Sequence, residues 1–153
     1  MFREMRFNDR KIDSEQIPAL LEKSQYGTLA VQGDNGYAYA VPLNYVYENG
    51  KIFIHGANTG HKVDALLANP KVSFCVICEA IAQPEQFTFS YTSVIAFGTA
   101  KLLNDEEKRH AIERFVRKYS SDNWDKAQKI IPSVWDKFVA FEISIDNITA
   151  KTK

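Results

Sequence analysis

The residues best suited to binding an anion lie in one stretch, His55-Gly56-Ala57-Asn58-Thr59-Gly60-His61-Lys62. It follows a short apolar run and precedes a helical pattern, so we expect a loop that leads into a helix. The first four N–H groups of a helix lack partners within the helix, and the helix dipole adds partial positive charge there. Gly56 and Gly60 allow close approach, and Lys62 adds a full charge. The stretch predicts a phosphate site, although an ordinary strand-to-helix connection has a similar composition.

Other motifs with known chemistry are absent or weak. Neither the G-x-G-x-x-G pattern, the P-loop nor the G-x-S-x-G elbow occurs, so the sequence does not support nucleotide binding or serine hydrolysis by those routes. His55 and His61 could begin a metal site, but their spacing supplies no third ligand, and we predict no metal. The sequence assigns no catalytic residue, and the role of His55 stays open.

Cys75 and Cys78 form a C-x-x-C pair, a spacing found in redox dithiols and in half of a zinc site. The surrounding run 71–78 is apolar and β-branched, which is typical of a strand. Residues three apart in a strand point to opposite faces, with Cα atoms about 10 Å apart. A disulfide requires less than about 7 Å. We therefore predict two buried structural thiols and no disulfide.

The elements around these residues follow from hydrophobic periodicity. From Tyr37 to Tyr47 both alternating faces are fairly apolar, as in a barrel strand or a dimer interface, and Pro42 interrupts pairing on one side. Pro18 also shifts the start of the first helix towards Ile17. Strands are predicted at 27–32, 37–47, 51–55, 71–78, 86–103 and 138–145, helices at 13–24, 60–68, from 104 and at 124–134, and a looser segment at 79–85.

Length and composition limit the class of protein. The 153 residues fit one domain, 1–153, and 45% hydrophobic with 25% charged residues is ordinary for a globular protein. Lysine plus arginine and aspartate plus glutamate both total 19, which favours neither nucleic acid nor an anionic membrane as a partner. We find no membrane-length apolar run and no signal peptide, and we expect a cytoplasmic protein. The density of strands, with few helices, favours a barrel.

Several motifs together resemble one family. They are V-P-L-N-Y-V at 41–46, F-I-H-G-A at 53–57, G-H-K-x-D-x-L at 60–66, N-P-K-V-S-F at 69–74 and S-Y-T-S-V-I-A-F-G at 90–98. In this order they resemble the flavin-binding split-barrel proteins related to pyridoxamine 5'-phosphate oxidase. The similarity runs from about Met5 to Lys151. Within the family, the chain looks most like the nitroimidazole-resistance (Nim-like) subgroup.

The resemblance implies a mainly β fold with flanking helices (α+β), a six-stranded FMN-binding split β-barrel. It further implies a homodimer with one FMN in each of two sites at the interface. The FMN phosphate would lie near His55, Gly56, Ala57, Gly60, His61 and Lys62, and the isoalloxazine edge near Val41, Pro42, Leu43 and Asn44. The block 91–94 would supply further contacts, above all through Ser93 and its neighbour Val94.

The function expected from the resemblance is an FMN-dependent oxidoreductase that reduces a small, nitroaromatic substrate. Two features of true pyridoxamine phosphate oxidases, an arginine- and lysine-bearing phosphate strand and an arginine-containing C-terminal segment, are not evident here, which argues against vitamin B6 oxidation. The alternative is a flavin- or haem-binding protein without turnover, used in storage or sensing. The sequence names neither the substrate nor the electron donor.

Overall fold

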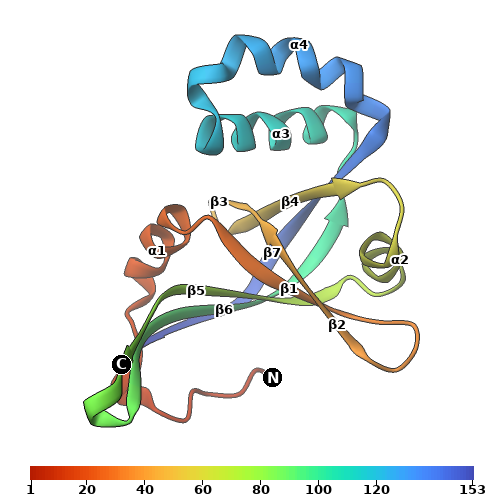
Figure 1. The fold of residues 1–153 in the computed structure, drawn as a ribbon. Helices are drawn as coiled ribbons and strands as arrows, with labels where there is room; N and C mark the ends of the chain where they lie inside the picture. Colours follow the sequence, from red (N-terminus) through yellow and green to blue (C-terminus); the bar gives the residue numbers. More distant parts are fainter.

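The computed structural model describes all 153 residues and contains one antiparallel sheet (Figure 1). Its strands follow the order β2-β1-β5-β6-β7-β4-β3. The edge strands β2 and β3 are consecutive along the chain, so the sheet must curve until its two ends meet, as in a split barrel. The strands are β1 (Tyr26–Gln32), β2 (Ala38–Asn44), β3 (Val46–Glu48), β4 (Lys51–Ala57), β5 (Lys71–Gln83), β6 (Thr88–Leu102) and β7 (Phe138–Thr152).

The strand count is seven, and the expected six-stranded barrel is wrong in this respect. The difference arises at Tyr45, where the run predicted as a single strand divides into β2 and β3. Tyr45 is fully buried, and its hydroxyl donates to the Leu21 carbonyl at 2.7 Å. Its backbone N–H donates to the Tyr119 hydroxyl at 3.3 Å instead of to a neighbouring strand. Two side-chain contacts therefore turn the chain from one sheet edge to the other.

The sheet is also longer than the hydrophobic pattern indicated. β5 continues to Gln83, so the looser segment predicted at 79–85 is wrong for most of its length. It pairs with β6 from Lys71↔Thr99 to Gln83↔Thr88, with a register shift between Ile77 and Glu79. This long hairpin projects away from α2 (Figure 1). β7 likewise continues past its predicted end to Thr152, and a register shift between β6 and β7 falls between Phe97 and Gly98.

Four helices cover the sheet, namely α1 (Ile17–Lys23), α2 (His61–Ala68), α3 (Asp105–Tyr119) and α4 (Trp124–Val134). Pro18 stands in the first turn of α1, which therefore begins at Ile17 after a short 3₁₀ turn. Residues of α1 and α2, including Leu21 and Leu66, belong to the main core with Leu29, Ile54 and other strand residues. α3 packs against the sheet, and α4 lies outside α3 (Figure 1).

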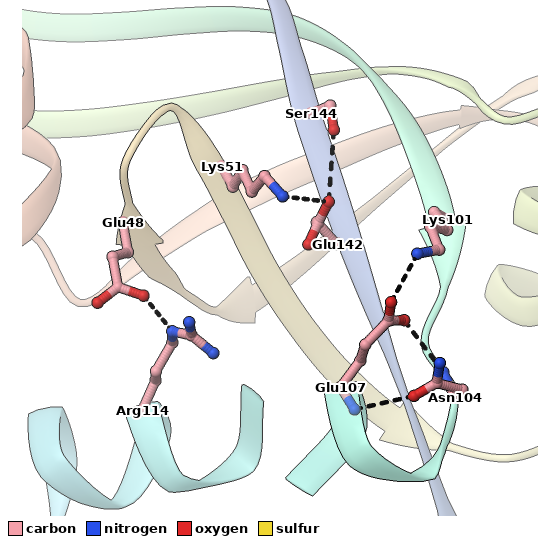
Figure 2. Close-up of polar contacts among 8 residues, drawn as sticks. All are labelled: Glu48, Lys51, Lys101, Asn104, Glu107, Arg114, Glu142 and Ser144. Carbon is pink, nitrogen blue, oxygen red and sulfur yellow. Dashed lines mark hydrogen bonds and ion pairs between the residues drawn. The ribbon is translucent and has the colours of Figure 1, made fainter. Parts of the chain in front are cut away.

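Polar contacts fix the start and the orientation of α3 (Figure 2). Asn104 caps the helix: its side chain accepts from the Glu107 N–H at 2.9 Å, and the Glu107 carboxylate accepts from the Asn104 N–H at 3.3 Å. Glu107 also pairs with Lys101 of β6 at 2.8 Å, and Arg114 pairs with Glu48 of β3. These contacts hold α3 over a second core of six buried residues: Val46, Phe53, Leu103, Ala111, Phe115 and Ala140.

None of the helices has the length and apolar character needed to cross a bilayer.

Candidate functional site

The residues of the predicted anion site lie where β4 leads into α2, and the loop is shorter than expected because His55, Gly56 and Ala57 still belong to β4. Gly60, the N-cap residue, has φ of 124°, and no side chain caps the helix. A Cβ atom at Gly56 would lie 2.5 Å from the Lys62 ammonium nitrogen, so this amine rests against the glycine backbone. No acid pairs with Lys62, and partial burial lowers the pKa of its amine. An uncapped helix start and an unpaired, partly desolvated cation together suit a phosphate group.

His61 connects this helix start to β2. Its ring stacks on Tyr39 with 4.3 Å between centroids, and its Nε2 lies 3.7 Å from the Asp34 carboxylate. Both contacts hold the imidazole over β2 and turn it away from Gly56 towards the 33–37 turn. The structure therefore brings the helix start and β2 together through Tyr39, a residue that the sequence did not mark as part of the site.

Residues 41–44 lie on β2, an edge strand that pairs only with β1. Val41 and Leu43 are half-buried and pack on the main core, whereas Pro42 and Asn44 are exposed. The outer edge of β2 therefore keeps unpaired backbone groups, and Pro42, opposite Thr28, has no N–H to offer. The motif V-P-L-N predicts that the backbone of this strand edge meets a planar ligand with polar atoms along its rim.

His55 lies on the other face of β4. Side chains alternate along a strand, so His55 lies on the same face as Phe53, towards α3, while Ile54 and Gly56 lie on the barrel face. The imidazole packs edge-on against Phe115 at 4.5 Å between centroids. Burial, and secondarily the charge of Lys62, lowers the pKa of His55. His55 is therefore a partly desolvated imidazole on the wall of a cavity between α3 and α4, and the strand separates it from Lys62.

Ser93 and Val94 do not join these residues within one chain. Ser93 pairs with Lys151 of β7, whereas Gly56 pairs with Val139, twelve positions away along the same strand. At about 3.3 Å per residue, this separation is roughly 40 Å of strand contour. Ser93 lies on the outer face of β6, and the Val94 side chain, 1% exposed, points into the core. The backbone of Val94 lies inside the sheet, opposite Val76 of β5 and Ala150 of β7, so this residue offers a ligand neither its side chain nor an open strand edge.

The two thiols are not joined to each other. Cys75 and Cys78 are free, as predicted, but both are half-buried where full burial was expected. Cys75 stands within the β5 ladder, and Cys78 lies at the register shift between Ile77 and Glu79. No group of three or more histidine, cysteine, aspartate or glutamate side chains could hold a metal ion.

Comparison with known families identifies the family of the chain. The family model for pyridoxamine 5'-phosphate oxidase matches residues 13–152, nearly the whole chain. The chain belongs to the pyridoxamine 5'-phosphate oxidase family. This confirms the family predicted from the motifs at 41–46, 53–57 and 60–66. No curated protein sequence matches the chain.

Several solved structures share the fold of this pyridoxamine 5'-phosphate oxidase family member. A candidate 5-nitroimidazole antibiotic resistance protein from Bacteroides thetaiotaomicron has 23% identity and a TM-score of 0.75, with 93% of this chain and 86% of that chain covered. A FAD-binding protein from Mesorhizobium loti has 23% identity and a TM-score of 0.65, with coverages of 94% and 97%. A FAD- and haem-binding protein from Mycobacterium smegmatis has 20% identity and a TM-score of 0.76, with coverages of 94% and 73%.

Proposed function

We propose that this family member binds FMN and acts as an oxidoreductase on a small nitroaromatic substrate. The observation that carries the proposal is the unpaired Lys62 ammonium resting on Gly56 beside the uncapped start of α2. One cation and one helix start match a single terminal phosphate, which FMN has and riboflavin lacks. Two proteins of similar structure bind FAD, and a third is a candidate nitroimidazole-resistance protein, which supports flavin binding and this substrate class.

We place the isoalloxazine ring along the free edge of β2. The ring edge carries hydrogen-bonding atoms, and the backbone of residues 41–44 offers matching groups while half-buried Val41 and Leu43 hold the strand in place. A bound flavin supplies the two-electron chemistry that no side chain provides. The residues of this chain bind the phosphate, orient the ring edge and shield it from water. They need not include a dedicated acid or base.

We further propose a homodimer in which the partner completes each site. The outer face of the β5–β6 hairpin carries exposed apolar side chains, among them Ile77 at 62%, Ile95 at 39% and Phe97 at 41% exposure. Ser93 lies on this same face, far from Lys62 of its own chain. Covering the face with a second copy would remove apolar surface from water. It would also allow Ser93 of one copy to approach the Lys62 site of the other.

Three measurements test the proposal. The purified protein should show flavin absorbance, NAD(P)H should bleach it without oxygen, and a nitroaromatic should restore it. A Soret band in place of the flavin spectrum would favour the haem-binding alternative, and bleaching without reoxidation by any nitroaromatic would favour flavin storage. Light scattering should return the mass of two chains, or about twice 17.4 kDa. A monomer at micromolar concentration would refute the shared site.

A further inference from the structure

An open cavity lies between α3 and α4, outside the barrel. Its volume is about 590 Å³, within the range of about 300–1,000 Å³ typical of small-molecule sites. Ala127, Ile130, Ile131 and Val134 form one stripe of α4 at helical spacing and all line the cavity. Its other apolar walls are Ile112, Val116 and Phe138. The apolar faces of the two helices therefore leave room for a ligand where close packing would fill the space.

The polar groups of this cavity favour one sign of charge. Lys126 and Lys137 line it, and no aspartate or glutamate does. Neither lysine takes part in an ion pair, although acids at Asp125 and Asp136 stand next to them in the sequence. Two exposed cations at an apolar cavity without a counter-charge would attract an anionic group. The remaining polar lining residues are Ser120 and Asn123, which carry no charge, and His55, whose pKa is lowered by burial.

We propose that the cavity between α3 and α4 binds an amphipathic carboxylate, with its apolar body between the helices and its carboxylate at Lys126 and Lys137. The site is distinct from the Lys62 site because β4 separates the two: Gly56 faces Lys62, and His55 faces the cavity. Binding here does not require flavin. The inference therefore goes beyond the proposed function and stands or falls separately from it.

The test uses a fluorescent acid, 11-(dansylamino)undecanoic acid, and its primary amide, titrated into the purified protein. Charged hydrogen bonds should make the acid bind about tenfold or more tightly than the amide. Lys126→Gln combined with Lys137→Gln should reduce this ratio to near one and leave amide binding unchanged. Lys129→Gln is the matched control, because Lys129 is an exposed lysine of the same helix outside the cavity lining. It should behave as wild type.

Two further variants test the position of the ligand. Ala127→Trp fills the cavity and should remove binding of both probes. Because Ala127 is half-buried, Ile130→Glu provides a second variant at a lining residue that is 46% exposed, where a charged side chain can reach water and should disturb folding less. It should weaken the acid selectively by repulsion. Equal affinities for acid and amide in the wild type would refute the charge assignment. Binding of neither probe, full binding of both probes by Ala127→Trp, or an unchanged ratio of acid to amide affinity in Ile130→Glu would refute the site.

Discussion

Lys62 gives the most direct test of the anion site. Lys62→Ala removes one charged donor but leaves the α2 backbone donors and the helix dipole in place. A hydrogen bond to a charged group contributes about 1.5–3 kcal/mol, so FMN affinity should fall roughly 10- to 150-fold. Folding should change little, because Lys62 has no acid partner to lose. Lys62→Glu should weaken FMN further, since it places a negative charge beside the phosphate.

Riboflavin separates phosphate binding from folding, because it keeps the ring and lacks the phosphate. Fluorescence titrations of FMN and riboflavin into the flavin-free wild type, Lys62→Ala and Lys129→Ala should show a loss only for FMN with Lys62→Ala. Gly56→Ala should also weaken FMN binding, but less than Lys62→Ala does. The new Cβ would displace the Lys62 ammonium nitrogen, which now lies 2.5 Å from that position. Equal losses for both ligands would mean that Lys62 acts through folding. Unchanged FMN binding would place the phosphate elsewhere.

The pKa of the Lys62 amine adds a pH signature to the same experiment. Burial favours the neutral amine in the flavin-free protein and lowers its pKa below the usual lysine range. Only the charged form attracts phosphate, so FMN affinity should fall as the pH rises through that lowered pKa. Lys62→Ala should show no such decline. Parallel pH profiles for the two proteins would contradict the assigned role.

Three further predictions concern stability and the thiols. Because burial lowers the folded-state pKa of His55, the unfolded state binds more protons below about pH 6.5. As the pH falls from about 6.5 through the folded-state pKa, the free energy of unfolding of the wild type should therefore decrease more than that of His55→Phe. Urea midpoints that change in parallel with pH in the two proteins would contradict this. Tyr119→Phe removes the hydroxyl that contacts the Tyr45 backbone and should cost about 1–3 kcal/mol in urea unfolding; a loss near zero would mean that water replaces it. Cys75→Ser and Cys78→Ser should each leave flavin content unchanged and cost at most about 1–3 kcal/mol, and a native disulfide seen by mass spectrometry would overturn the strand argument.

Local patterns predicted the elements whose causes are local. The α4 helix runs from Trp124 to Val134, as its periodicity indicated, and the acids after Asn104 mark a true capping box. The start of α1 at Ile17 follows from Pro18. The anion stretch was also local, because Gly56 at the end of β4, Gly60 before α2 and Lys62 in the first turn of α2 lie within seven residues of one another. Such features depend on neighbours a few residues away.

Contacts between residues far apart in the sequence determine the features that the hydrophobic pattern did not predict. The division of the 37–47 run depends on Tyr119, which is 74 positions from Tyr45. The length of β5 beyond Cys78 depends on pairing with β6, because those residues are largely exposed and leave no hydrophobic alternation. The placement of His55 on the α3 side, away from Lys62, follows from strand alternation relative to a helix far along the chain. The α3–α4 cavity likewise requires the relative position of two helices.

The place of β7 in the sheet constrains the order in which the chain can fold during synthesis. β7 lies between β6 and β4, so the β3–β4 hairpin joins the rest of the sheet only through it. The end of β4 at Ala57 and the start of β7 at Phe138 are 81 positions apart. At about 5–20 residues per second, β4 waits roughly 4–16 s after its own translation for the strand that it pairs with. Ile52 and Ile54 stay without their β7 partners during this interval, so the nascent chain leaves these apolar side chains uncovered until β7 has been made.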